Sequence, residues 1–409
     1  MTAPDGQGKP DEAAVGFVMA LGRALHRYGT PAHRLEDSLV KVCAGLGIAA
    51  EVFTSPTALI MSFGRPTDLR SRMLRVDASV LDMGKLAEVD GVADDVIAHE
   101  ITPEEGERRL EQIIAGKRRY GHGLSTLVHG VTAGALAVFF HGGLYDVAAA
   151  AGIGLTLGLL AQLLQRSTDQ ARVFELVGSA FAAFAANVFS SVTPHITASL
   201  VTLAALVVLL PGMSLTVAMT ELATRHLIAG TARLMSAVIV LLELVVGVAL
   251  GDRAAQALVH VHQATPVALP EYANWIALAA SSVALAVLVQ AQVRAFGWIV
   301  AGCVVAYVGS RFGAVWLGDN QLGVLIGAFA LGLLANIYAR YLDRPSQVVS
   351  VPAMLVLVPG GMGFRGMASL LNQDTLTGVE TLFAMFIVAI AIVAGLLIAN
   401  ALVSPRRSL

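Results

Sequence analysis

The feature that most constrains this chain is a series of long apolar segments that begins after Gly123 and continues almost to the last residue. Residues 1–120 contain 33 charged side chains, whereas the remaining 289 residues contain only 23. A soluble protein usually has about 25% charged residues, and this chain has 14%. The distribution predicts a water-soluble domain at 1–120, followed by a part that is embedded in a lipid bilayer.

Segments of the second part have the length of membrane-spanning helices. A helix needs roughly 20 apolar residues to cross about 30 Å of hydrocarbon, and its backbone groups must satisfy one another within the lipid. Ten segments come close to that length. The expected spans are 124–140, 143–164, 171–190, 196–212, 230–250, 272–291, 295–310, 321–341, 348–362 and 379–402.

The placement of Lys and Arg predicts the orientation of these spans. With residues 1–120 inside, the inside segments carry twelve basic residues and the outside segments carry three, Arg253, Arg311 and Arg365. By the positive-inside rule, both termini are then cytosolic. No signal peptide is expected. Because Arg exceeds Lys and Ala and Val are abundant, we expect a multi-pass protein of a bacterial cytoplasmic (inner) membrane.

The soluble part has the pattern of a small α+β domain. Phe17, Leu21 and Leu25 recur at helical spacing, and Thr30 and Pro31 are expected as the N-cap and first residue of a second helix. Further elements are expected at 31–44 (helix), 48–53, 58–63 and 73–76 (strands), and 79–88 and 103–115 (helices).

The membrane part contains an internal repeat. Residues 207–250 align with 355–398 without a gap at an offset of 148 residues, and Pro211-Gly212 falls on Pro359-Gly360. Five expected spans precede the second half, and an odd number inverts the second copy relative to the first. Inverted repeats are typical of secondary transporters, because two similar halves that face opposite ways can exchange conformations.

These observations predict an all-α polytopic membrane protein with about ten transmembrane helices in two inverted five-helix repeats, preceded by a small cytosolic α+β domain. The expected domains are the cytosolic domain at 1–120, a first membrane repeat at 121–252, an extracytoplasmic linker at 253–270 and a second membrane repeat at 271–409.

Each Pro-Gly pair ends a strongly apolar run and should break a membrane helix. Pro removes a backbone donor, and Gly adds conformational freedom. A broken helix exposes carbonyl groups and a helix N-terminus, which can hold the carboxylate or amine of a substrate. We therefore expect Pro211, Gly212, Pro359 and Gly360 to line a substrate path. The alternative is that both pairs are plain helix ends at the membrane surface.

Two carboxylates are candidates for proton coupling or for pairing with a substrate amine. Glu243 lies inside its expected span, where an ionised group costs at least about 2.5 kcal/mol. It could instead be a hydrogen-bonded packing group. Glu175 is the second candidate, with an interfacial ion pair to Arg172 as the alternative.

Other polar residues have less specific roles. Asn187 and Asn336 lie in or near the ends of spans and either contact substrate or bridge helices. Glu221 and Arg225 are four residues apart, and a solvated surface pair is the default expectation. In the soluble part the polar candidates for a site are His26, His33, Glu36, Asp37 and Thr54.

Several classes of function lack their signatures. The ten His residues show no HExxH spacing, no P-loop is present, and the net charge of −2 gives no basic footprint for nucleic acid. We therefore expect no metal, no cofactor, no built-in ATPase and no nucleic-acid partner. A membrane-tethered hydrolase with a catalytic N-terminal domain remains the alternative from another functional class.

Four segments of the chain resemble the threonine/serine exporter family. Residues 21–47 and 51–63 are similar to the start of its soluble part. LLPGMSLTVAMTELATRHLIAGTARL (209–234) resembles the first-half signature, and VPAMLVLVPGGMGFRGM (351–367) resembles the second. The family positions carried over are Glu221, Gly230 and Arg233, with both Pro-Gly pairs.

The resemblance implies a transporter rather than an enzyme. It implies export of threonine and serine driven by an ion gradient, and we expect proton coupling and alternating access. Some relatives move dicarboxylates, so an exporter of small dicarboxylates such as succinate is an alternative, although we expect no Arg or Lys deep in the membrane. The expected partners are the amino-acid substrate, a coupling proton and the bilayer. The sequence leaves open whether the protein forms a homodimer.

Overall fold

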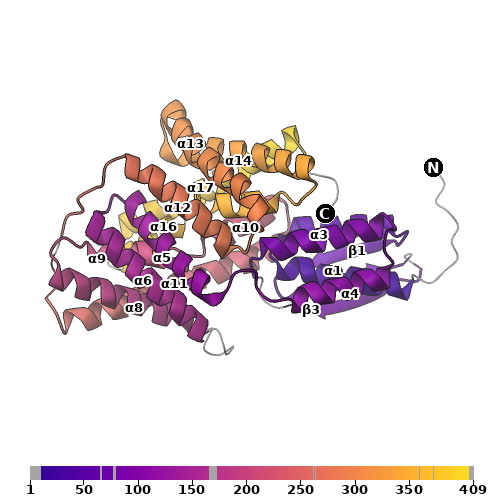
Figure 1. Cartoon of the computed structure of the whole chain (residues 1–409), viewed down its shortest axis with the longest axis horizontal. Coiled ribbons are helices and arrows are strands. Elements are labelled where there is room, and N and C mark those ends of the chain that lie inside the picture. Colours follow the sequence, from indigo (N-terminus) through magenta and orange to yellow (C-terminus); the bar gives the residue numbers. More distant parts are fainter. Residues whose placement is uncertain are drawn as a thin grey trace.

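The structure is a computed structural model, and it describes residues 11–64, 67–76, 80–164, 173–260, 262, 264–358, 360–371 and 373–404. Helices dominate these residues, and a small three-stranded sheet lies near the N-terminus. Figure 1 shows the sheet with its helices at one end of the molecule and the apolar helices gathered at the other. The expectation of a helical membrane protein with an N-terminal α+β part is confirmed.

The N-terminal part consists of four helices around an antiparallel sheet of order β1-β2-β3. Its elements are α1 (Glu12–Arg27), α2 (Ala32–Gly45), β1 (Ala50–Thr54), β2 (Ala58–Phe63), β3 (Arg70–Arg75), α3 (Met83–Ile97) and α4 (Pro103–Ala115). Alternate residues of β2, such as Leu59 and Met61, are fully buried, as is Phe17 of α1. The helix expected at 79–88 begins later and runs further, because Asp82 caps α3 by accepting a bond from the Lys85 amide at 2.9 Å.

Seven helices of the described residues are long and apolar enough to cross a membrane. They are α5 (His122–Phe139), α6 (Leu144–Leu164), α8 (Phe174–Val192), α11 (Leu227–Gln256), α13 (Phe296–Leu317, after the 3-10 turn Val293–Ala295), α14 (Asn320–Leu342) and α17 (Thr375–Leu402). The shorter apolar helix α12 (Tyr272–Leu288) packs against α5 and α13. Large apolar side chains are exposed on their outer faces, for example Val315 at 87%, as expected where lipid covers a helix.

The expected spans at 196–212 and 348–362 are not continuous helices. The first comprises α9 (Ala198–Leu206) and the start of α10 (Gly212–Ala223), and the second comprises α15 (Gln347–Met354) and the start of α16 (Gly360–Leu371). The nine residues of α9 rise about 14 Å, less than half of a membrane core. Helix α9 ends at Leu206 and helix α15 ends at Met354, each before its Pro-Gly pair, so a count of ten uninterrupted spans is not supported.

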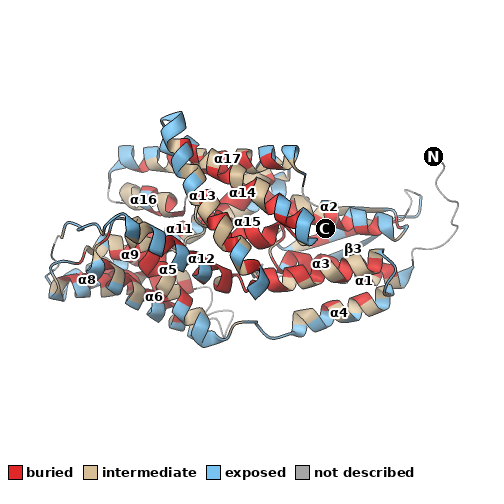
Figure 2. Ribbon diagram, turned by 45° about the horizontal axis from the view of Figure 1, so that its top comes forward, coloured by how far each residue is buried: buried red, intermediate tan, exposed pale blue. Residues whose placement is uncertain are grey.

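Helix bounds in the second half follow those of the first at a constant distance. Helices α10 and α16 begin and end 148 residues apart, and so do the starts of α11 and α17. The two long helices run in opposite directions. Helix α11 begins beside the N-terminal part, where His226 contacts Glu36, whereas α17 ends beside the C-terminal end of α14, and Arg344, just after α14, donates to the Ala87 carbonyl of α3. Figure 2 shows α15 almost entirely buried among the surrounding helices.

Candidate functional site

The two Pro-Gly segments meet in the membrane part. A Cβ atom on Gly212 would lie 3.1 Å from the Gly360 amide nitrogen and 1.9 Å from Cγ1 of Val358. A Cβ atom on Gly360 would lie 3.2 Å from the Gly212 Cα. Only a residue without a side chain permits this approach of two backbones. Pro211 is the N-cap of α10, and Pro359 lies outside the described residues. We call this contact the glycine junction, defined by Gly212 and Gly360.

The glycine junction brings two helix N-termini together. Helices α10 and α16 start at its two glycines and contact each other, and each also packs on a long helix of the other half, α17 and α11 respectively. The first amides of a helix have no partner within the helix and carry partial positive charge. No side chain caps the start of α10. Such an arrangement can bind an anionic group without a formally charged residue.

The two candidate carboxylates lie on neighbouring helices. Glu175 is in the first turn of α8 and interacts electrostatically with Glu243 of α11. Their helices reach the two Pro-Gly segments: Leu241 of α11 lies against Gly363 of α16, and Gly178 of α8 lies against Leu209 just before the break. The expected ion pair of Glu175 with Arg172 lies outside the described residues.

Asn187 and Asn336 lie in hydrogen bonds between helices, away from the glycine junction. The Asn187 amide donates to the carboxylate of Asp252 at 2.7 Å, which ties α8 to the end of α11. The Asn336 amide donates to Oδ1 of Asn400 at 2.8 Å, which ties α14 to the end of α17. Asp252 and Asn400 are again 148 residues apart. The structure does not bring these two asparagines to the expected substrate path.

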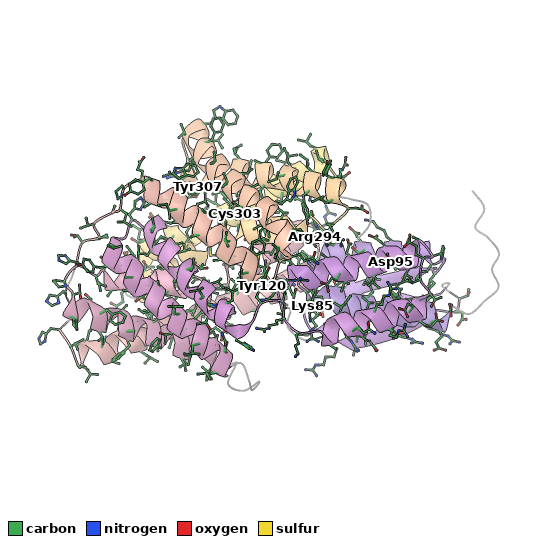
Figure 3. The ribbon with its side chains drawn as sticks, in the orientation of Figure 1. Lys85, Asp95, Tyr120, Arg294, Cys303 and Tyr307 are labelled. Carbon is green, nitrogen blue, oxygen red and sulfur yellow. The ribbon has the colours of Figure 1, made fainter. Side chains whose placement is uncertain are left out.

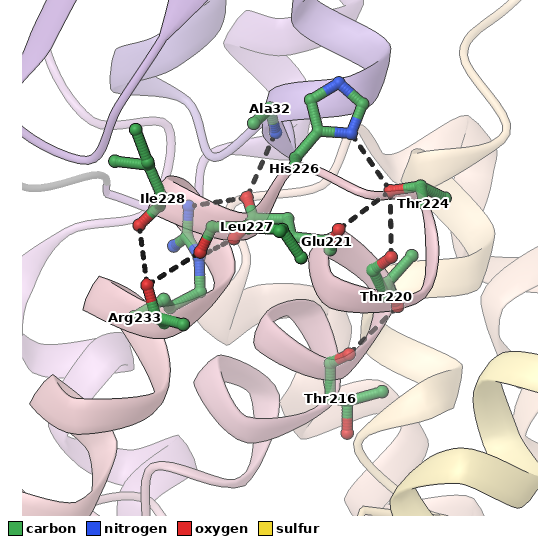
Figure 4. A network of polar contacts seen from close by, with 10 residues as sticks. Ala32, Thr216, Thr220, Glu221, Thr224, His226, Leu227, Ile228 and Arg233 are labelled. Atoms are coloured by element: carbon green, nitrogen blue, oxygen red, sulfur yellow. Dashed lines mark hydrogen bonds and ion pairs between the residues drawn. The ribbon is translucent and has the colours of Figure 1, made fainter.

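A second polar cluster joins the membrane part to the N-terminal part (Figure 4). Glu221, at the end of α10, is fully buried and accepts two hydrogen bonds from Arg233 of α11, at 3.0 and 3.1 Å. Gly230 allows α11 to pass close to α10, since a Cβ there would lie 3.0 Å from the Ala218 carbonyl oxygen. The expected surface pair of Glu221 with Arg225 is therefore wrong.

Glu221 also caps a helix of the N-terminal part. The Ala32 amide, at the start of α2, donates to Oε1 of Glu221 at 3.1 Å. The N-cap of α2 is Pro31 and not the expected Thr30, and it provides no side-chain cap. A carboxylate from another part of the chain therefore supplies both the acceptor and the negative charge that a helix N-terminus favours.

Candidates from the soluble part lie beside this cluster. Glu36 accepts bonds from the amide and hydroxyl of Thr54, both at 2.8 Å, and contacts Nε2 of His226 at 3.2 Å. The rings of His33 and His226 are 6.1 Å apart. His26 is buried, whereas Asp37 is exposed on α2. We call Glu36, His33, Glu221, His226 and Arg233 the interdomain cluster.

The contact between the two parts should weaken in acid. Burial, with the charges of Arg34 and His226, lowers the pKa of His33 to about 3, and burial together with Arg233 lowers the pKa of His26. A lowered histidine pKa favours the neutral ring in the folded chain, so its contribution to stability is fully present above about pH 6.5 and is lost as the pH falls below that value. For His33 the loss is about 1.4 kcal/mol per pH unit. The protection factors of the α2 amides, which correct for the intrinsic slowing of exchange in acid, should therefore fall between pH 7 and pH 5. A His33→Gln variant should show a smaller change, and an equal change would contradict the assignment.

Comparison with known proteins gives two family matches that together cover most of the chain. A family model described as a threonine/serine exporter matches residues 16–254. A second model, described as Threonine/Serine exporter, ThrE, matches residues 274–402. Both family descriptions name exporters. No solved structure matches the chain.

Similar curated proteins come from fungi. An uncharacterized protein of Schizosaccharomyces pombe is 30% identical over 366 residues, 86% of this chain and 48% of the relative. Pheromone-regulated membrane protein 10 of Debaryomyces hansenii is 28% identical over 377 residues, 88% of this chain and 37% of the relative. The counterpart in Saccharomyces cerevisiae is 28% identical over 355 residues, 85% of this chain and 46% of the relative. The chain thus spans about half the length of these relatives, or less.

The fungal relatives contradict the expected location in a bacterial cytoplasmic membrane. That expectation rested on Arg, Ala and Val usage, which reflects base composition and carries no physical information about a membrane. The multi-pass membrane character is supported by the seven long apolar helices. Because one family model matches more than half of its residues, the chain belongs to the threonine/serine exporter family.

Proposed function

We propose that this protein is a secondary active exporter of threonine and serine that works by alternating access at the glycine junction. The observation that carries the proposal is the close contact of Gly212 with Gly360 at the start of two helices. The two breaks come from corresponding positions of the sequence repeat, and the following long helices run in opposite directions. This supports two inverted halves, preceded by a soluble domain at 1–120. The first half extends beyond the expected bound at 252, because α11 continues to Gln256, so the linker begins after that residue and not at 253.

The substrate chemistry follows from the charges near the glycine junction. Threonine and serine carry one carboxylate and one ammonium group. The carboxylate would accept bonds from the first-turn amides of α10 and α16, as at other broken membrane helices. The ammonium group would face the carboxylates of Glu175 and Glu243. Two neighbouring carboxylates in a membrane repel each other unless one is protonated, so the same pair supports proton coupling.

The interdomain cluster supports a gating role for the soluble domain. His33, Glu36 and His226 lie between the two parts of the chain rather than in an open cleft. Glu221, at the end of α10, holds the start of α2 directly. A movement of α10 during transport would therefore reach the soluble domain. This arrangement favours a gate over the catalytic centre of a tethered hydrolase.

One observation favours dicarboxylates as the second candidate substrate class. Arg365 lies on α16, five residues after Gly360, and its guanidinium carbon is 5.0 Å from the ring centroid of Phe140. The chain therefore has a cation one and a half turns from the glycine junction, which could bind a second carboxylate. Proteoliposomes loaded with unlabelled threonine, serine or succinate distinguish the two classes by counterflow of the labelled compound. Flux with succinate alone would overturn the amino-acid proposal.

Replacing Glu243 with glutamine should abolish the pH dependence of transport. The change keeps the shape of the side chain and removes its ionisation, so a proton can no longer bind and leave at this position. Threonine counterflow should persist, whereas uphill transport driven by a pH gradient should fall by at least about tenfold. Glu175→Gln should have the same direction of effect. A Glu243→Gln protein whose uphill transport keeps its pH profile would show that coupling lies elsewhere.

A further inference from the structure

A charged groove lies on a face of the soluble part that the proposed function does not use. It has a volume of about 850 Å³ and lies between helices α3 and α4, next to the connection that leads into α5. Figure 3 shows Lys85 and Asp95 on this side of the soluble part, with Tyr120 where the chain enters the membrane part. Arg344, just after α14, closes the groove from the other half of the molecule.

Basic groups exceed acidic groups in this groove, although the chain as a whole has a net charge of −2. Its lining contains five basic side chains, Lys85, Arg109, Lys117, Arg119 and Arg344, and three acidic ones, Asp82, Glu88 and Asp95. The lining of the groove therefore carries a local surplus of positive charge.

The ion pairs of the groove leave guanidinium donors for a ligand. Arg119 donates to Glu88 through Nη2 at 2.8 Å, and Arg109 donates to Glu105 through Nε at 3.0 Å and to Asp95 through Nη1 at 3.3 Å. Arg344 uses Nη1 for the Ala87 carbonyl at 3.2 Å. Each guanidinium group has five N–H donors in a planar fork, so most of them stay available.

The groove also lies at the level where lipid headgroups are expected. Lys117 and Arg119 precede α5 by a few residues, and Arg344 follows α14 by two. Both helices are long and apolar enough to span a membrane. Basic residues at such positions attract anionic phosphate groups.

We propose that this groove binds a phosphate-bearing anion. Arginine forks and lysine together suit the oxygens of a phosphate group, and the volume admits a headgroup or a nucleotide. A bound anion would connect the soluble part to the start of the first membrane half through Lys117 and Arg119, and to the second half through Arg344. It would thereby clamp the two membrane halves in one arrangement relative to the soluble part. The inference does not depend on the transported substrate.

Titration calorimetry of the full chain in neutral detergent tests the site with two probes. One is dioctanoyl phosphatidylinositol 4-phosphate and the other is ATP, with dioctanoyl phosphatidylcholine, whose zwitterionic headgroup has no net charge, as the control. We expect saturable binding that weakens with added salt. Tighter binding of the lipid identifies a headgroup as the source of the phosphate, and tighter binding of ATP identifies a soluble nucleotide.

Two variants and one control locate the binding. Lys117→Gln/Arg344→Gln should weaken the affinity for the preferred probe at least tenfold. Lys117→Glu, at an exposed side chain that can change without unfolding the domain, should do the same. Lys41→Gln removes an exposed cation of α2 outside the groove and should leave the affinity unchanged. Unchanged affinity in both groove variants, or no binding of either probe, would overturn the proposal.

Discussion

Replacing Glu221 with alanine should lower the free energy of unfolding by about 2–4 kcal/mol. Removing one partner of a buried ion pair typically costs about 3–5 kcal/mol, because the other charge stays buried without compensation. We place the effect slightly lower because the side chain of Arg233 is 22% exposed and can regain some water. Unfolding of the full chain in mixed detergent micelles, followed by circular dichroism, gives the value.

A double-mutant cycle separates the pair from simple loss of packing. Once Glu221 is alanine, the further change Arg233→Ala should cost much less than it does in the wild type. Glu12→Ala is the control. It breaks the ion pair between Arg72 and Glu12, whose side chain is 86% exposed, and should change the free energy of unfolding by less than about 1 kcal/mol. Additive effects of Glu221→Ala and Arg233→Ala would contradict a direct interaction.

Glu221→Ala should also loosen the N-terminal part locally. Without Glu221 the Ala32 amide loses its acceptor, and the start of α2 loses the one side-chain cap that it has among the described residues. Hydrogen exchange at the first turn of α2 should accelerate by at least about tenfold, which corresponds to about 1.4 kcal/mol of local opening free energy. Glu221→Gln, which keeps one amide oxygen as acceptor, should give a smaller acceleration.

Much of the architecture could be predicted because it depends on composition and periodicity. The change from charged to apolar sequence after Gly123 located the start of the membrane part, and α5 begins at His122. The alternation of apolar residues predicted β2 at its observed bounds, 58–63. The Pro-Gly pairs predicted breaks because proline and glycine act on the local backbone, and α10 and α16 begin at the two glycines.

Contacts between distant segments could not be predicted in the same way. Glu221 was paired with Arg225 on helical spacing, but Arg225 has a positive φ of 66° at the end of α10, so the helix stops before the pair can form. The actual partner, Arg233, lies beyond a turn and on another helix. The family signature, which has an acidic residue at 221 and a basic one at 233, was the only signal that connected the two. Likewise, Thr30 satisfies a capping rule, yet the cap comes from Glu221, which accepts a bond from the Ala32 amide 189 positions away.

The span count failed for a related reason. Hydropathy measures how apolar a segment is and does not register where its backbone stops being helical, so 196–212 and 348–362 resembled complete spans. Each has enough apolar residues, but the break leaves only eight or nine of them in the helix before the Pro-Gly pair. The shortened helices are therefore a direct consequence of the breaks that the same sequence predicted.

Gly212→Ala should reduce transport at least about tenfold while the protein still inserts and folds. The new methyl group would lie 1.9 Å from Cγ1 of Val358, a side chain that must turn away, and 3.1 Å from the Gly360 amide nitrogen, a backbone neighbour that cannot rotate in this way. Overpacking of this kind costs about 1–3 kcal/mol. If that strain falls on one conformation of the transport cycle, about 1.4 kcal/mol already changes a rate tenfold. Gly360→Ala, whose methyl group would meet the Gly212 Cα at 3.2 Å, should act in the same direction.

The matched control for this prediction is Gly152→Ala in α6. Nothing lies within 4 Å of a Cβ atom at that position, and the residue is exposed on a membrane helix. Alanine there should leave threonine counterflow unchanged, since it only improves helix propensity. If Gly212→Ala and Gly360→Ala also transport at the wild-type rate, the two helix breaks can separate without consequence. The place where the two halves meet would then be structural, and the substrate path would have to run through another part of the membrane domain.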